Sequence, residues 1–261
     1  MSDVRSLLRP LSARSLIASA LLGSHPPRLP GNLLVALAER FDIAPGTARV
    51  ALSRMVDRGE LQNDHGTYEL AGDLLERQHR QDASRTPPPS AWDGDWEQAV
   101  IVVTGRSASE RSRLRAALTA LNLGERREGL WMRPANLDPA RQPGARAATG
   151  GLVEWYRVCP AATVSARALA GEVFDLDEWA TTATALCDAL ASAQARLPDE
   201  RGAVAEGFTL ASAALRHLVH DPQLPADLQP DRWPSDDLRT AYAAFEHDYQ
   251  DLLRAFFRSQ R

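Results

Sequence analysis

Lysine is absent from the chain of 261 residues, so all 30 of its basic residues are arginine. Cysteine occurs only twice, at Cys159 and Cys187, without the spacing of a disulfide framework or a structural zinc site. Apolar runs such as Ala99–Val103 are far shorter than the ~20 residues that a membrane-spanning helix needs. These absences favour a cytoplasmic protein that has no membrane contact, no bound metal and no cofactor.

The charge is distributed unevenly along the chain, although the formal net charge is only −4. Residues 1–63 hold eight arginines and five acidic residues, whereas residues 171–261 hold eight arginines and sixteen acidic residues. The two segments therefore carry +3 and −8. This distribution argues against a general nucleic-acid coat and favours a protein that binds phosphate at one end only.

The length fits two or three domains, each large enough to bury a core. Three consecutive prolines, Pro87–Pro89, mark the clearest boundary, because they favour a stiff extended linker over helix or sheet. We predict an α+β protein with a winged helix-turn-helix domain at 1–83, a proline-rich linker at 84–91, a ferredoxin-like domain at 92–170 and a helical domain at 171–261.

The N-terminal segment has the order of a winged helix. Helical spacing of apolar residues predicts helices that follow Ser12, Asn32 and Ala44. The second and third of these helices are separated only by a short turn. Residues 25–31 contain three prolines and are predicted to form a loop. Alternating residues on both sides of Asp64-His65-Gly66 predict a hairpin from Leu61 to Leu70.

The third helix has two different faces. Ala48, Leu52, Met55 and Val56 are predicted to point inward, and the small Gly46 allows the start of the helix to approach a nucleic-acid backbone. The outer face and the hairpin then carry residue types that contact bases or phosphates, and they form the predicted DNA-binding site: Thr47, Arg49, Val50, Ser53, Arg54, His65 and Thr67. Winged helices also mediate protein contacts, so a scaffold that binds other proteins is an alternative.

The middle segment predicts strands at 96–103, 130–133 and 153–158, a helix at 110–122 and a loop at 134–151. This order is typical of a ferredoxin-like unit. Aromatic and arginine side chains near these strands suit an anionic, partly apolar ligand, although ordinary core packing is the alternative. The predicted ligand-binding residues are Trp92, Trp96, Arg106, Trp131, Arg133, Trp155 and Arg157.

The C-terminal segment predicts helices at 177–197, 204–219 and 236–259. The aromatic stripe of the last helix is either core or a dimer interface. His217-x-x-His220 with Asp221 suits a metal, although histidine is also favoured at a helix end. The carboxylates of Asp175, Asp177 and Glu178 suit acid–base chemistry, but they also match the charge that a helix N-terminus favours.

Several sequence blocks, taken together, resemble the PaaX-type transcriptional repressors, which control phenylacetate breakdown. The blocks run in order along nearly the whole chain: Ser15–Gly23, Thr47–Val56 with Arg58-Gly59, Trp92–Trp96, Gly129–Leu137, Phe174–Trp179, Leu215–Pro225 and Trp233-Pro234. The resemblance implies the three-part architecture and a homodimer that binds a double-stranded DNA operator. It also implies release by a small effector, which in the founding members is an aryl-acetyl coenzyme A thioester.

We therefore expect a homodimeric, sequence-specific DNA-binding regulator that is not an enzyme, and that acts as a repressor released by an effector such as an aryl-acyl-CoA. One alternative is a metal-dependent hydrolase or nuclease that uses His217 and His220 together with the carboxylates of Asp175, Asp177 and Glu178. The other is the winged-helix scaffold for protein contacts.

Overall fold

The computed structural model describes residues 12–87, 91–138, 140, 142–197 and 203–259. Its contacts divide the chain into two compact units. The first takes the described residues within 1–83, 184–216 and 237–261, and the second takes those within 84–183 and 217–236. Among the described residues, no helix has the length and apolar character that crossing a membrane requires.

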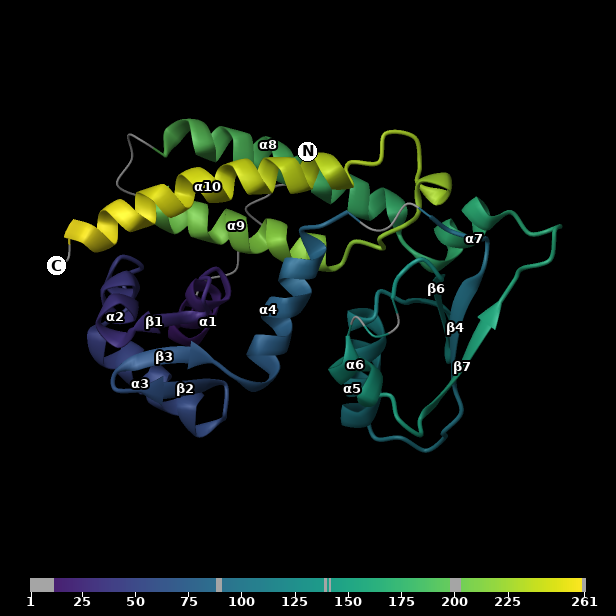
Figure 1. Cartoon of the computed structure of the whole chain (residues 1–261), viewed down its shortest axis with the longest axis horizontal. Helices are drawn as coiled ribbons and strands as arrows, with labels where there is room; N and C mark the ends of the chain where they lie inside the picture. The colour runs from purple at the N-terminus through teal and green to yellow at the C-terminus, as the bar shows by residue number, and fades with distance from the viewer. Residues whose placement is uncertain (1–11, 88–90, 139, 141, 198–202, 260–261) are drawn as a thin grey trace. The chain divides into compact units, whose positions relative to one another are not determined.

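The first unit contains the predicted winged helix (purple to blue in Figure 1). Helices α1 (Ala13–Leu22), α2 (Gly31–Glu39) and α3 (Pro45–Asp57) precede strands β2 (Leu61–Asp64) and β3 (Thr67–Leu70). Ser12 caps α1, because its side chain accepts a hydrogen bond from the backbone N–H of Ser15. A core that includes Ile17, Leu34 and Met55 joins the three helices. The predicted helices and hairpin are thus confirmed.

The prediction of an uninterrupted loop at residues 25–31 is wrong. Arg28–Pro30 form strand β1, which pairs antiparallel with β3 and gives a three-stranded sheet in the order β1-β3-β2. Leu29 lies opposite Tyr68 in this pairing. The strand is three residues long and its partner lies about 40 residues further along the chain, so local periodicity carries no signal for it.

Four further helices contribute to the first unit. Helix α4 (Gly72–Ser84) follows the wing, and α8 (Leu176–Arg196), α9 (Ala203–Val219) and α10 (Ser235–Ser259) match the predicted C-terminal helices. Each of these last three also has residues in the second unit. Of the predicted linker, residues 88–90 lie outside the described residues.

Side chains pack these helices against one another. The guanidinium of Arg196 on α8 binds the carboxylate of Glu206 on α9 at 2.6 Å. Phe41, just after α2, meets the ring of Phe208 on α9 edge-on, with 5.3 Å between ring centroids. Four residues of the aromatic stripe of α10 are buried within the chain, which supports core packing for this part of the helix: Leu238, Tyr242, Phe245 and Tyr249. Leu252 is half-buried, and the side chain of Phe256 lies outside the described residues.

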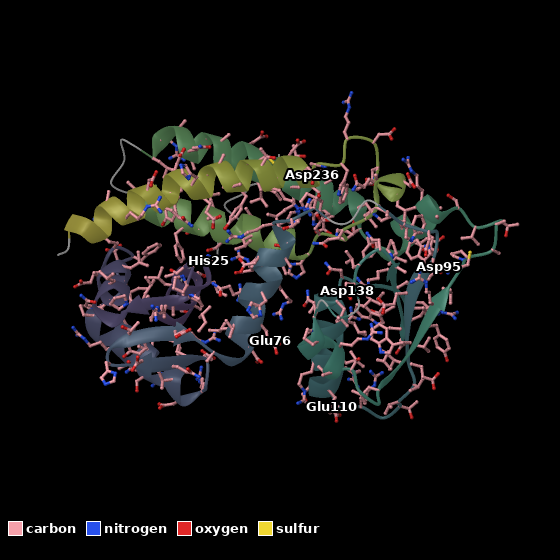
Figure 2. All side chains as sticks on the ribbon, viewed as in Figure 1. His25, Glu76, Asp95, Glu110, Asp138 and Asp236 are labelled. Carbon is pink, nitrogen blue, oxygen red and sulfur yellow. The ribbon has the colours of Figure 1, made fainter. Side chains whose placement is uncertain are left out.

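The second unit contains a four-stranded antiparallel sheet in the order β5-β6-β4-β7. Along the chain it runs β4 (Trp96–Ile101), α5 (Ala108–Ala120), β5 (Gly124–Arg127), β6 (Leu130–Pro134), α6 (Pro143–Ala147) and β7 (Val153–Val158). This is the ferredoxin-like βαββαβ arrangement. A capping box starts α5, because the side chains of Ser107 and Glu110 accept hydrogen bonds from each other's backbone N–H groups. Glu110 is labelled in Figure 2.

Three elements of this unit are absent from the sequence prediction. Strand β5 and helix α7 (Ala166–Val173) were not predicted, and α6 lies where a continuous loop was expected. Strand β5 is a polar edge strand, Gly-Glu-Arg-Arg, without hydrophobic alternation. Its Gly124 lies so close to α7 that an added Cβ would be 2.4 Å from the carbonyl oxygen of Val173. Close packing of this kind is invisible to local patterns.

A buried ion-pair network crosses the sheet. Glu97 on β4 accepts a hydrogen bond at 2.7 Å from Nε of Arg133, its direct neighbour on β6, and it also binds Arg146. Burial raises the pKa of Glu97, but the two guanidiniums outweigh burial and hold it below its ordinary value. Glu97 is therefore ionised at neutral pH and neutralises a nearly inaccessible arginine.

Replacing Glu97 with glutamine should destabilise the fold strongly. Arg133 would remain buried without a counter-ion, and the loss of one partner of a buried pair costs about 3–5 kcal/mol. Urea unfolding of E97Q measures this loss, with exposed Glu128→Gln as the control for an equal change in charge. Equal unfolding midpoints for the two variants would contradict the role given to Glu97.

Candidate nucleic-acid interface

Helix α3 is positioned by three buried side chains. Ala48, Leu52 and Met55 recur every three or four residues and are at most 2% exposed. Pro45 occupies the first turn, where its missing N–H costs no helical hydrogen bond. The buried stripe therefore determines which face of α3 is turned to solvent.

The exposed face of α3 holds the five helix residues predicted to contact DNA: Thr47, Arg49, Val50, Ser53 and Arg54. Among the described residues, the guanidinium of neither Arg49 nor Arg54 has a hydrogen-bond or ion-pair partner. Val50 is 52% exposed, which is unusual for a large apolar side chain in this protein. The face thus presents two uncompensated guanidiniums, two hydroxyls and an apolar group, a set that suits phosphates and base edges.

The wing ends in a two-residue turn. His65 and Gly66 have φ values of +47° and +87°, and the side chain of Asn63 accepts a hydrogen bond from the backbone N–H of Gly66. The imidazole of His65 is almost fully exposed to solvent, and its Nδ1 lies 2.6 Å from a carboxylate oxygen of Asp64. Thr67 is half-buried between Asp64 and Pro30 in the sheet. His65 is therefore the more accessible of the two wing candidates.

Arg58 belongs to the same surface, although the sequence predicts it only as the end of the helix. Arg58 is exposed at the C-cap of α3, and its guanidinium has no hydrogen-bond or ion-pair partner among the residues that the structure describes. Its position beside Gly59, where the helix gives way to the wing, was the available signal.

The seven residues predicted to bind a ligand do not come together. Trp96 packs with Leu169 in one core cluster, whereas Trp131 packs with Leu114 in another, on the opposite face of the sheet. Arg133 is buried against Glu97. Trp92 donates to the backbone oxygen of Asp95, and Arg106 is half-buried at the start of α5.

Only Trp155 and Arg157, of those seven, line a cavity of about 460 Å³ in the second unit. Trp155 is stacked under Arg146, whose guanidinium carbon lies 3.4 Å from the ring centroid. Arg157 binds Asp95 at 2.6 Å and also Asp93. Because these arginines already have acidic partners, an anionic ligand here would have to compete with the protein's own carboxylates.

His217 lies in an aromatic stack within the second unit. Trp179 stacks on its imidazole at 4.6 Å and on Trp233 at 4.5 Å, and Nε2 of His217 lies 2.9 Å from the backbone oxygen of Trp179. Among the described residues, no group of three potential ligands surrounds a metal position. Asp175 caps α8 by accepting from the N–H of Glu178, which bears out the helix-end interpretation of that carboxylate.

The burial of His217 should make folding sensitive to mild acid. Burial lowers the pKa of His217, and the Trp179 carbonyl and Asp221 only partly oppose this effect. At mildly acidic pH the folded state then binds fewer protons than the unfolded state. The free energy of unfolding should therefore fall as the pH drops below about 6.5, the ordinary pKa of histidine. Tm measured from pH 8 to 5 should fall less steeply in His217→Gln than in the wild type. An exposed control, His79→Gln, should follow the wild type; identical slopes for all three proteins would contradict the assignment.

A substitution at Gly46 can distinguish contact with DNA from contact within the chain. A Cβ added to Gly46 meets nothing within 4 Å. Gly46→Ala should therefore leave Tm unchanged or raise it, because alanine favours a helix by about 1 kcal/mol. If the start of α3 approaches a DNA backbone, the same variant should bind duplex more weakly in a gel-shift assay. Unchanged binding would show that this end of the helix stays away from DNA.

Comparisons with known proteins cover nearly the whole chain. Three family models match in order: "PaaX-like protein" at residues 12–74, "PaaX protein central Cas2-like domain" at 89–156 and "PaaX-like protein C-terminal domain" at 174–259. No curated protein matches the chain. Among solved structures, the uncharacterized protein Rv0674 from Mycobacterium tuberculosis is 36% identical, with a TM-score of 0.68 over 94% of this chain and 98% of that one. The chain therefore belongs to the PaaX family of regulators.

Proposed function

We propose that the protein is a cytoplasmic, homodimeric regulator that binds a specific double-stranded DNA operator through α3 and the wing. The exposed face of α3 carries this proposal, because Arg49 and Arg54 project from a rigid helix without any acidic partner among the described residues. In a folded protein such guanidiniums are ready to bind an external polyanion. Family membership supports the same direction.

The residue types suggest which side chains contact bases and which contact phosphates. Arg49 or Arg54 can bond the O6 and N7 atoms of a guanine, and the methyl groups of Val50 suit the methyl group of a thymine. Thr47, Ser53, His65 and Thr67 are assigned to phosphates or groove edges, which set the register of the helix on DNA. In a dimer, two copies of α3 would reach half-sites about 34 Å apart.

Repression with release by an effector completes the proposal. An effector, such as an aryl-acyl-CoA thioester, shifts DNA binding only if it binds the free and DNA-bound conformations with different affinities. No enzymatic step is required of the protein.

Arg54→Ala tests the base-reading face. A lost base contact should weaken binding to the DNA upstream of the protein's own gene by about 5- to 150-fold, which corresponds to 1–3 kcal/mol. Gel shifts should be run on this duplex and on a scrambled one. Arg113→Ala, which removes an equally exposed arginine from α5, is the matched control and should bind as the wild type does.

Salt dependence completes this experiment. Binding should weaken steeply as salt rises, because phosphate contacts release counterions. The assignment of α3 fails if R54A keeps both the affinity and the preference for the upstream duplex. A protein-contact scaffold would instead show no salt-dependent binding to any duplex.

A further inference from the structure

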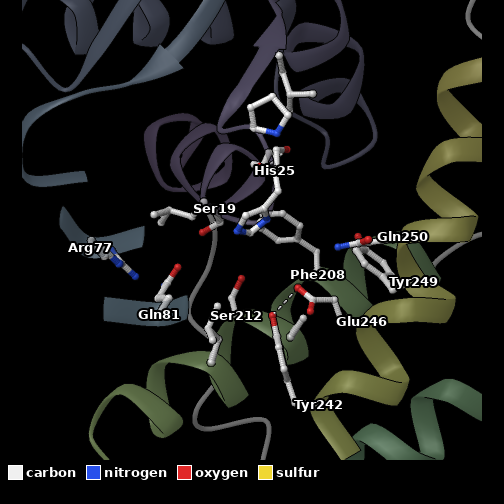
Figure 3. A pocket seen from close by; sticks show the side chains of 18 of the residues that line it. Ser19, His25, Arg77, Gln81, Phe208, Ser212, Tyr242, Glu246, Tyr249 and Gln250 are labelled. Atoms are coloured by element: carbon white, nitrogen blue, oxygen red, sulfur yellow. Dashed lines mark hydrogen bonds between the residues drawn. The ribbon is translucent and has the colours of Figure 1, made fainter. Parts of the chain in front are cut away.

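A cavity of about 440 Å³ lies within the first unit, where the winged helix meets the C-terminal helices (Figure 3). The segment from the end of α1 to β1 forms one wall, and α4, α9 and α10 form the others. Figure 3 shows Arg77 and Gln81 of α4 on one side and Phe208, Glu246 and Tyr249 across from them. This volume is in the range of small-molecule sites.

The wall opposite Arg77 is aromatic. Phe208 and Tyr249 are each 5% exposed, and Phe208 is held in place by the edge of Phe41. Burial raises the pKa of Tyr249, so this side chain stays neutral. Tyr242 donates a hydrogen bond at 2.9 Å to Glu246, the acidic residue that lines the cavity. A ligand body placed here would contact mainly rings and aliphatic groups.

Arg77 is the exceptional residue of this cavity. It is half-buried, yet no hydrogen bond or ion pair joins it to any residue that the structure describes. Two other arginines of the same unit do have acidic partners: Arg14 pairs with Glu60, and Arg196 pairs with Glu206. Burial lowers the pKa of Arg77, and the nearby positive charges of Arg216, Arg80 and Arg14 lower it further. A desolvated cation among other cations is costly unless an anion is supplied.

We propose that this cavity binds an apolar organic anion, with Arg77 bound to the carboxylate or phosphate and the Phe208 and Tyr249 rings packed against the apolar body. The inference rests on the proposed function, since it locates the effector site of the regulator. The cavity contacts both the segment that leads into the wing sheet and the helices α9 and α10. A ligand there can therefore favour one arrangement of the winged helix over another.

The test uses the full-length protein and the fluorescent anion 8-anilinonaphthalene-1-sulfonate, which has an aromatic body and one sulfonate. The wild type should bind it saturably, and Arg77→Gln should weaken binding about tenfold or more, because a charge-assisted hydrogen bond is lost. Arg80→Gln is the matched control: it removes the same charge from the same helix but does not line the cavity. Equal weakening in R77Q and R80Q would overturn the proposal.

A second variant keeps Arg77 and removes the space. Ser212 lines the cavity from α9, so Ser212→Trp should abolish probe binding by filling it. Binding to S212W with wild-type affinity would place the probe elsewhere and overturn the proposal. R77Q without probe should melt at the wild-type Tm or higher, because an unpaired cation is removed; a lower Tm would reveal an internal role for Arg77 and count against the site.

Competition identifies the source of the anion. Phenylacetate should displace the probe from the wild type more strongly than its neutral amide, and equal displacement would contradict a role for charge. Stronger displacement by phenylacetyl-CoA than by phenylacetate would indicate that Arg77 binds a phosphate of coenzyme A. Stronger displacement by phenylacetate would indicate that Arg77 binds a free carboxylate. R77Q should still bind the upstream duplex in the absence of ligand, so loss of the effector site is distinguishable from failure of the DNA-binding proposal, which R54A tests.

Discussion

The burial of one face of α3 is the constraint on which the DNA-binding proposal depends. Leu52 and Met55 are buried in a core that they share with α1 and α2. Burial of each such side chain contributes about 1.5–3 kcal/mol to the free energy of folding. Rotating the helix to bury its other face would place Arg49 and Arg54 in that apolar core. The hydrophobic effect therefore orients the arginines without contacting them.

The arginines of the two regions proposed for ligands differ in their partners. In the ferredoxin-like unit, Arg133, Arg146 and Arg157 are all neutralised by carboxylates of the same unit. In the first unit, the arginines of α3 and Arg77 of α4 lack such partners among the described residues. Charges that a fold leaves uncompensated are the ones available to external anions, which is why both proposals concern the first unit.

The degree of burial separates these two kinds of unpaired arginine. Arg49 and Arg54 are exposed, so their charge costs little and attracts a large polyanion from a distance. Arg77 is half-buried beside aromatic side chains, where a single desolvated anion gains more from each hydrogen bond. The same residue type is therefore suited to DNA at one place and to a small molecule at another.

Elements with strong local signals were predictable from the sequence alone. Helical periodicity located α1, α3 and α8 to α10, and the Asp64-His65-Gly66 turn located the wing, because these features depend on neighbours within one or two turns. The outward face of α3 followed from the same periodicity. In contrast, β1 and β5 depend on pairing with strands elsewhere, and the polar edge of β5 carries no hydrophobic alternation.

Only the tertiary structure decided how the tryptophans and arginines are grouped. Trp96 and Trp131 seemed equivalent in the sequence, but the alternation of side chains across a sheet sends them to opposite faces. Arg77 looked like one charge on a polar helix, and no local pattern reveals that residues from the segments 19–29, 208–215 and 242–254 line a cavity with it. Periodicity determines which face of an element is buried; which distant side chains that face meets is determined by packing.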